Sequence, residues 1–261
     1  MIRLIATDMD GTLLDPRKRV GKNFEAVVKK LNEKGIMFAL ASGRNYQRIK
    51  DKFKNLNLDL MYISDNGNYI EYKGEILNKN ILSREDVNSL YDFLRNRNYC
   101  KATYSNEKSI YTDDKVIYRI GKLFMYKSEL VSNIKNLHEE IIKCSILVTP
   151  KYHQSLLKEL NERFPYLHIV SSSKHTIDVN YGSMNKGEAI KLLRSKFNLT
   201  EDEVMVFGDY LNDTEMMKSC THSYAMANAH KEIKKIAKYI APSNKKNGVL
   251  ATIEKVILNN E

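Results

Sequence analysis

Short apolar segments that end in glycine or polar residues recur in the first and last thirds of the chain. They lie at residues 2–6, 36–41, 60–64 and 204–207. Short apolar runs of this kind are typical of the buried strands of a parallel sheet. Amphipathic stretches separate them, such as the one from Phe24 to Leu31, which Gly35 ends. This alternation predicts an α/β fold, with a doubly wound, Rossmann-like parallel sheet.

The pattern changes between residues 83 and 182. Short strand-like pieces alternate there with two or three helical patterns, including an expected strand at 122–125 and an expected helix at 129–137. Such a mixture predicts an inserted α+β domain with its own core. We therefore expect one domain made of residues 1–82 and 183–261, interrupted by a second domain of residues 83–182.

The composition indicates a globular protein of the cell interior. Hydrophobic residues make up 43% of the chain and charged residues 28%, and no apolar run approaches the roughly 18 residues of a membrane helix. The N-terminus shows no signal-peptide pattern. The cysteines Cys100, Cys144 and Cys220 are far apart. They suit packing roles in a reducing compartment. We expect a cytoplasmic protein with no membrane partner.

The formal net charge is +10, and it is spread along the chain without a basic tail. A positive field can steer anionic substrates toward a site. A lysine-rich solvated surface explains the same charge and is favoured. No nucleic-acid partner is expected.

Two carboxylates, Asp8 and Asp10, follow the first apolar segment, and Gly11 comes next. Ligands bind at the carboxyl ends of strands in open α/β sheets. Neighbouring acids repel each other, and a divalent metal with oxygen ligands would compensate. An acidic turn is the alternative. A calcium-binding EF-hand is excluded, because its glycine comes at the sixth loop position and a helix precedes the loop.

Two further strand ends and one helix start carry suggestive side chains. Ser42-Gly43-Arg44 follows the second apolar segment, which suits either an anion site or a simple helix N-cap. Asp209, Asn212 and Asp213 follow the segment at 204–207, and Lys186 opens a helix. Taken together, these groups are what phosphoryl transfer requires. The glycine-rich fingerprints of nucleotide-binding proteins are absent from the sequence.

The sequence resembles the haloacid dehalogenase-like phosphatases, specifically the Cof-type group with a subfamily IIB cap. The family's motifs appear in order as Asp8-Met9-Asp10-Gly11-Thr12, Ala41-Ser42-Gly43-Arg44, Asn185-Lys186-Gly187 and Gly208-Asp209-Tyr210-Leu211-Asn212-Asp213. The resemblance covers the whole chain, including the insert. One departure is Asp178, which stands where similar proteins often carry glutamate.

The resemblance implies a role for each acid. Asp8 would be the nucleophile that forms an aspartyl-phosphate, and Asp10 would be the general acid and base. Mg²⁺ would be held by the carboxylates of Asp8 and Asp209 and by the main-chain carbonyl of Asp10. Asp213 would complete this metal site through a water molecule, or would orient Lys186.

The resemblance also implies phosphate-binding groups. They are Ser42, the amides of Met9 and Gly43, Asn212 and Lys186. Thr12 would fix the loop geometry, and Arg44 would be either a helix-cap neighbour or a phosphate-side cation.

The insert would form a mobile cap that sets substrate choice. His175 and Asp178 are candidates for contacts with the leaving group, alongside purely structural roles.

The expected function is therefore that of a Mg²⁺-dependent phosphatase acting on a small phosphorylated metabolite, as a monomer or weak dimer. A sugar phosphomutase of the same superfamily is one alternative. A non-catalytic regulator that binds a phospho-ligand or nucleic acid is the other.

Overall fold

The computed structural model describes residues 1–123 and 127–259. This part of the chain divides into two compact units. The core unit comprises Met1–Arg44, Ile49–Asn78 and Asn185–Glu261, and the inserted unit comprises Asn45–Arg48 and Lys79–Met184.

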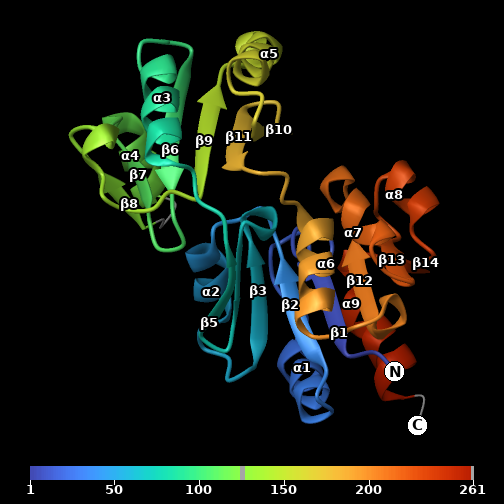
Figure 1. The fold of residues 1–261 in the computed structure, drawn as a ribbon. Helices are drawn as coiled ribbons and strands as arrows, with labels where there is room; N and C mark the ends of the chain where they lie inside the picture. The colour runs from blue at the N-terminus through green and yellow to red at the C-terminus, as the bar shows by residue number, and fades with distance from the viewer. Residues whose placement is uncertain (124–126, 260–261) are drawn as a thin grey trace. The chain divides into compact units, whose positions relative to one another are not determined.

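The core unit is built on one sheet. Within the described residues it has eight strands in the order β14-β13-β12-β1-β2-β3-β4-β5 (Figure 1). Its parallel strands are β1 (Leu4–Asp8), β2 (Met37–Ala41), β3 (Leu60–Ser64), β12 (Val204–Gly208), β13 (His222–Met226) and β14 (Tyr239–Ala241). Strands β2 and β3 lie on one side of β1, and β12, β13 and β14 lie on the other. Doubly wound sheets bind their ligands at such a point, where the strand order changes direction.

Strand β1 lies between β2 and β12, as the sequence predicts. Asp8 pairs in register with Ala41 of β2, and Thr7 pairs with Phe207 of β12. Leu4, Ile5 and Ala6 have no exposed surface, so the strand is buried on both faces. The carboxyl ends of these strands therefore bring residues from both ends of the chain together.

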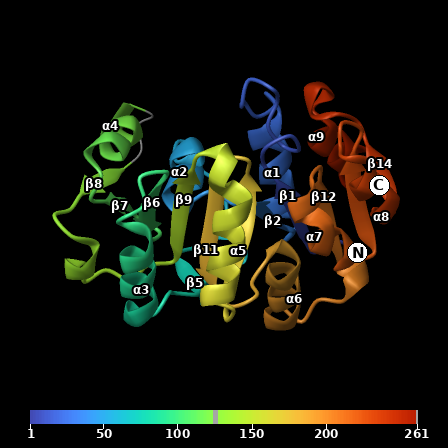
Figure 2. The same ribbon diagram turned by 90° about the horizontal axis from the view of Figure 1, so that it is seen from above.

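Helices cover both faces of this sheet. Figure 2 shows α1 (Phe24–Glu33) and α9 (Gly248–Ile253) on one side of β1, β2 and β12, and α6 (Lys186–Lys196) and α7 (Thr214–Lys218) on the other. The core unit also contains most of α2 (Tyr46–Phe53), α8 (Lys231–Ile236), a π-helical turn at Glu254–Leu258 and several short 3₁₀ turns. The predicted fold class, a Rossmann-like core with an inserted α+β part, is confirmed.

A hairpin closes one edge of the sheet. Strands β4 (Tyr69–Tyr72) and β5 (Glu75–Lys79) are joined by Lys73 and Gly74, which both have positive φ angles, of 53° and 83°. Two successive residues in this region match the type I′ turn that favours tight hairpins. The sequence predicts this hairpin correctly.

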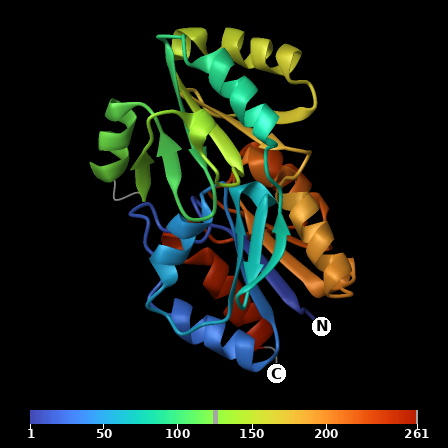
Figure 3. The same ribbon diagram turned by 60° about the vertical axis from the view of Figure 1, so that its left-hand side comes forward.

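The inserted unit has its own sheet, with six strands among the described residues in the order β10-β11-β9-β6-β7-β8. The strands are β6 (Cys100–Ser105), β7 (Ile110–Thr112), β8 (Ser128–Leu130), β9 (Lys143–Val148), β10 (Leu167–Ser173) and β11 (Thr176–Tyr181). Helices α3 (Arg84–Leu94) and α5 (His153–Arg163) lie along one face (Figure 3). Apolar side chains such as Leu90, Ile146 and Leu160 form a separate core beneath them.

Two sequence predictions in the inserted unit are wrong. Lys122 and Leu123 end helix α4 (Lys115–Leu123) instead of opening a strand, and residues 124–126 of that expected strand lie outside the described residues. The expected helix at 129–137 is strand β8, which pairs with β7, followed by a single 3₁₀ turn at Ile134–Asn136. Val131, Ile134 and Leu137 recur every third residue and pack against the core. That spacing imitates a helix over a short window.

No helix in the described ranges combines the length and apolarity needed to cross a membrane. Cys100, Cys144 and Cys220 are free and buried, which agrees with packing roles.

Candidate active site

A buried ammonium group joins two carboxylates at the carboxyl end of the core sheet. The Nζ atom of Lys186 lies 2.5 Å from Oδ1 of Asp8 and 2.7 Å from Oδ1 of Asp213. The Lys186 and Asp213 side chains have no exposed surface, and that of Asp8 is 9% exposed. Lys186 comes from α6, Asp8 from β1, and Asp213 from the 3₁₀ turn Leu211–Asp213 after β12. The site therefore depends on three elements that are distant in the sequence.

Local sequence fixes the start of α6. The side chain of Asn185 accepts hydrogen bonds from the amides of Gly187 and Glu188, so it caps the helix and leaves Lys186 as the first helical residue. A Cβ atom on Gly187 would lie 2.5 Å from the backbone of Glu215. Close packing of α6 on α7 thus requires glycine here.

Asp209 lies beside Lys186, Asp8 and Asp213, and residues of the first motif, Gly11 and Thr12, hold it in place. The hydroxyl of Thr12 donates to Oδ1 of Asp209 at 2.9 Å. Gly11 has a φ of +88°, and a Cβ atom there would lie 2.3 Å from Oδ2 of Asp209. Oδ2 of Asp213 accepts from the amides of Asp209 and Tyr210 at 2.9 and 3.1 Å, which fixes the turn itself.

The acids of this site carry more negative charge than the protein neutralises. Burial raises the pKa of Asp8 to about 7, while the Lys186 ammonium opposes the shift and the Asp213 carboxylate adds to it. Burial also raises the pKa of Asp209, against the hydrogen bond from Thr12. The pKa of Lys186 is raised, because Asp213 and Asp8 outweigh the effect of burial. The ammonium therefore stays charged.

The donor set fits a hard divalent cation. Asp8, Asp209 and Asp213 each offer an oxygen, and these oxygens lie within 4.8 Å of one another. Lys186 is the ammonium paired with this group, so an added cation would relieve the remaining repulsion. The carboxylate of Asp10 does not belong to this group among the described residues. A metal contact through the main-chain carbonyl of Asp10 stays a prediction.

The Asp10 carboxylate is instead held by cations. Arg44 donates from Nε to Oδ2 at 2.8 Å and from Nη2 to Oδ1 at 2.6 Å, and Nζ of Lys18 donates to Oδ1 at 2.7 Å. Partial burial raises the pKa of Asp10, but the hydrogen bonds and charges of Lys18 and Arg44 outweigh it and lower the pKa. The sequence left the role of Arg44 open and missed Lys18. In the structure both are partners of Asp10.

The predicted phosphate-side groups gather around the same strand ends. Ser42 is 3% exposed, and its hydroxyl accepts from the amide of Arg44 at 3.2 Å, so it holds the turn after β2. Met9 is fully buried, and its side chain belongs to the hydrophobic core. Asn212 lies exposed in the turn after β12.

A turn with strained backbone angles follows β3 and packs against Gly43. Asp65 and Asn66 both have positive φ angles, of 48° and 57°. The amide of Asn66 donates to the carbonyl of Ser42 at 3.0 Å, and its side-chain amide lies 3.3 Å from the position that a Cβ atom on Gly43 would occupy. The sequence identified Asn66 as a turn residue, and this turn packs against the second motif.

The two cap residues singled out from sequence lie in the inserted unit. Asp178 is buried and accepts hydrogen bonds from the hydroxyls of Ser145 and Ser172, both at 2.6 Å, with Lys143 4.0 Å away. These side chains share the sheet face opposite the helices, because Asp178 pairs with Ser145 across β9 and β11. His175 lies exposed in the turn between β10 and β11.

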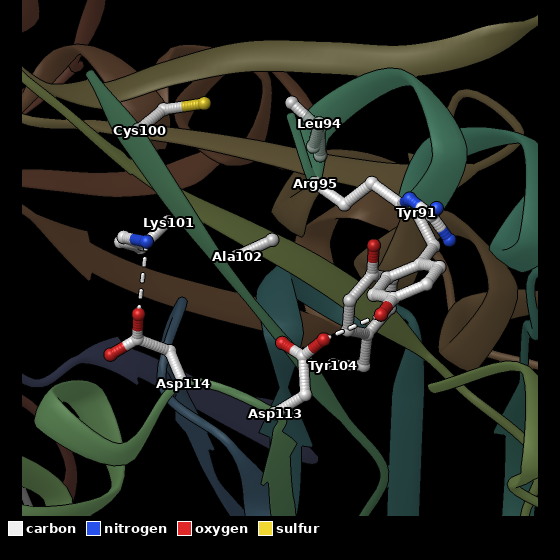
Figure 4. Close-up of a pocket in the computed structure, with 9 residues that line it drawn as sticks. All are labelled: Tyr91, Leu94, Arg95, Cys100, Lys101, Ala102, Tyr104, Asp113 and Asp114. Carbon is white, nitrogen blue, oxygen red and sulfur yellow. Dashed lines mark hydrogen bonds and ion pairs between the residues drawn. The ribbon is translucent and has the colours of Figure 1, made fainter. Parts of the chain in front are cut away.

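The inserted unit also contains a cavity of about 210 Å³ between α3, β6 and the turn before α4. Figure 4 shows Tyr91 and Tyr104 reaching into it from α3 and β6. Its charged groups largely pair with one another, since Lys101 lies 3.0 Å from Asp114 and the Tyr91 hydroxyl donates to Asp113 at 2.6 Å. None of the predicted catalytic residues lines this cavity.

Comparison with known proteins decides the family. Residues 5–253 match the sequence model of the haloacid dehalogenase-like hydrolases. The chain belongs to this family. The match includes the acids and Lys186 described above, so the recognition from sequence motifs is confirmed.

Curated relatives of this hydrolase are named phosphatases. It is 28% identical to the 5-amino-6-(5-phospho-D-ribitylamino)uracil phosphatase YbjI of Escherichia coli, over 98% of this chain and 96% of the relative. It is 27% identical to YcsE of Bacillus subtilis, which is named for the same phosphatase activity, over 98% and 96% of the two chains. The protein is accordingly an enzyme, a phosphoric monoester hydrolase.

Solved structures show the same fold. SMU.1108c from Streptococcus mutans is 32% identical and superposes with a TM-score of 0.87 over 99% of this chain and all of that one. A haloacid dehalogenase-like hydrolase from Bacteroides thetaiotaomicron has a TM-score of 0.89 over 98% of this hydrolase and all of its own chain, at 24% identity.

Replacing Gly11 by alanine should lower the phosphatase activity strongly, whereas the same change at Gly35 should not. Both glycines have positive φ, but a Cβ atom at Gly11 meets the Asp209 carboxylate, while nothing lies within 4 Å of one at Gly35. We expect Gly11→Ala to lower kcat/KM by about 100-fold, because displaced catalytic groups cost about that much. Gly35→Ala should lower the free energy of unfolding by about 1–2 kcal/mol. Equal activity of the two variants in a phosphatase assay would contradict the role of Gly11.

Metal binding should release a proton from Asp8. Its raised pKa means that the carboxyl is largely protonated below about pH 7 in the metal-free protein. Since a carboxylate must be deprotonated to bind a metal, Mg²⁺ affinity should fall roughly tenfold for each pH unit below about 7. Calorimetric titration in buffers of different ionisation enthalpy measures both affinity and proton release. A constant affinity between about pH 6 and about pH 8, with no proton release, would contradict this assignment.

Proposed function

We propose that this hydrolase is a Mg²⁺-dependent phosphatase that acts on a small phosphorylated metabolite through an aspartyl-phosphate on Asp8. The observation that carries the proposal is the buried ion pair of Lys186 with Asp8 and Asp213, with Asp209 beside it. This arrangement offers a carboxylate nucleophile, a fixed cation and oxygen ligands in one place.

Asp8 is assigned the attack on phosphorus. One of its carboxylate oxygens forms a bond to phosphorus while the bond from phosphorus to the ester oxygen breaks. The departing oxygen takes a proton from Asp10, the neighbouring acid in the first motif. In the second step Asp10, now a carboxylate, accepts a proton from a water molecule that attacks phosphorus, and the bond to Asp8 breaks to release phosphate.

Arg44 and Lys18 serve Asp10 in this scheme. The two hydrogen bonds from Arg44 fix the plane of the Asp10 carboxylate. Ion pairing also favours the charged form that accepts a proton in the second step. In the first step Asp10 must carry the proton, so substrate binding has to offset part of this pairing.

The remaining motif residues bind and neutralise the phosphate. Ser42, the amides of Gly43 and Met9, Asn212 and Lys186 are assigned to the phosphate oxygens, while Thr12 holds Asp209. Asp8 and Asp209 would hold Mg²⁺ together with the Asp10 carbonyl, and the ion would neutralise phosphate oxygens. Both oxygens of Asp213 already accept hydrogen bonds, so we assign it to orienting Lys186 and the turn after β12.

The inserted unit is proposed as the cap that selects the leaving group. Two relatives are named as phosphatases of a phosphorylated ribitylaminouracil, which makes that compound a reasonable member of any substrate panel. Identities of 28% and 27% leave the substrate of this chain to experiment. Sugar phosphates, nucleotides, and flavin or pyridoxal phosphates complete the panel.

Activity should depend on Mg²⁺. We expect phosphate release from at least one ester of the panel with Mg²⁺ present, complete loss in EDTA, and recovery when excess Mg²⁺ is added. The reason is that Asp8 and Asp209 repel the phosphate unless their charge is neutralised. Release of phosphate measured by a colorimetric assay tests this, and undiminished turnover in EDTA would exclude the metal assignment.

Substituting the two acids of the first motif should have separable effects. Asp8→Asn should abolish turnover, because an amide cannot act as the nucleophile. Asp10→Asn should lower kcat by about 100- to 10,000-fold, the usual contribution of a general acid–base group. Asp51→Asn is a matched control, because Asp51 is half exposed, lies 3.9 Å from Lys54 and belongs to none of the four motifs. Full activity of Asp8→Asn against an activated aryl phosphate would disprove the scheme.

A further inference from the structure

Two cations bind one carboxylate in the core unit, and a third binds the main chain of one of them. Arg44 and Lys18 both bind Asp10, as described above. The Nζ atom of Lys52, from α2, donates to the main-chain carbonyl of Lys18 at 2.6 Å. We call Lys18, Arg44 and Lys52 the Asp10 cation cluster.

This cluster is not balanced by the protein. Within the described residues, Lys52 has no carboxylate within ion-pair distance, and its ammonium is satisfied only by a neutral carbonyl. Partial burial and the Arg44 charge lower the pKa of Lys52, while the Asp10 and Asp15 charges oppose this effect. The Asp10 carboxylate therefore pairs with Lys18 and Arg44, while Lys52 is an exposed lysine with no ionic partner among the described residues. Neighbouring like charges cost free energy, and a further anion would offset that cost.

The loop that carries Lys18 is preorganised. Asp15 accepts from the backbone amide, Nε and Nη2 of Arg19, and the main chain closes between Asp15 and both Lys18 and Arg19. Lys18 itself has a φ of 61°, a conformation that an unconstrained lysine rarely adopts. The loop therefore directs Lys18 toward Asp10, although the lysine side chain is 59% exposed. A purely solvated lysine needs no such loop.

The position of the cluster relates it to the leaving group. If Asp10 protonates the ester oxygen, as the proposed function requires, the leaving group of the substrate lies next to Asp10 and its cations. We propose that the substrate carries a second anionic group, a carboxylate or another phosphate, which Lys18 and Lys52 bind. Arg44 remains on Asp10, because its two parallel hydrogen bonds are the stronger ones. A substrate with phosphate as its sole anion would leave Lys52 without an ionic partner.

A matched pair of ligands tests this inference. Glycerol 3-phosphate and 3-phosphoglycerate have the same size, and only the second has a carboxylate. Their Kd values should be measured by isothermal titration calorimetry with the full-length Asp8→Asn protein in Mg²⁺ at low ionic strength. The Asp8→Asn change blocks turnover by design, so binding is measured separately from catalysis.

We expect 3-phosphoglycerate to bind at least about tenfold more tightly, since charge-assisted hydrogen bonds contribute about that much. The ratio of the two Kd values should fall toward one as the salt concentration rises. Adding Lys52→Gln or Lys18→Gln should bring the ratio toward one. Lys54→Gln removes the same charge two residues along the chain, outside the cluster, and should retain the ratio.

Three outcomes would overturn the inference. They are equal Kd values for the two ligands, a ratio that persists in both Lys52→Gln and Lys18→Gln, and no measurable binding of 3-phosphoglycerate. Failure of the proposed function shows separately, as absence of phosphate release by the unmodified enzyme from every ester of the panel.

Discussion

The buried ammonium of Lys186 is the constraint on which the rest of the core unit depends. A buried charge without partners costs several kcal/mol, so this lysine requires carboxylates placed accurately around it. Asp8 and Asp213 meet that need at 2.5 and 2.7 Å. They are supplied by the first strand of the chain and by a turn more than two hundred residues later. The parallel pairing of β1 with β12 makes their meeting possible.

The same constraint explains the chemistry. Lys186 fixes one oxygen of Asp8, yet it cannot neutralise Asp209 as well, so the site retains negative charge in a buried place. Such a site favours a divalent cation, and a dianionic phosphate can then approach an otherwise repulsive group of acids. Fixed groups of this kind need little reorganisation during the reaction, which is how enzymes stabilise charge that develops in a transition state.

The sequence predicts those parts of the site that follow from strand ends. Asp8, Ser42 and Asp209 each follow a short apolar strand, and the parallel arrangement of β1, β2 and β12 then brings them together. Lys186 is predicted from its place in the third motif at the start of a helix, and the structure adds that Asn185 caps this helix. Arg44 and Lys18 could not be assigned, because their contacts with Asp10 depend on a loop with a positive φ angle and on side-chain directions. The segment after α4 was misassigned because a three-residue apolar spacing suits both a helix and a 3₁₀ turn that packs on a core.

The location of the phosphoryl group during turnover tests the account most directly. The Asp10→Asn protein should be mixed with an activated aryl phosphate and Mg²⁺, quenched in acid, digested and mapped by mass spectrometry. An activated leaving group needs little protonation, so attack still occurs, whereas hydrolysis of the intermediate lacks its base. The account predicts a phosphorylated peptide that contains Asp8, and no such peptide from a protein that also carries Asp8→Asn. A phosphoryl group on any other residue, or label that survives the Asp8→Asn change, would contradict it.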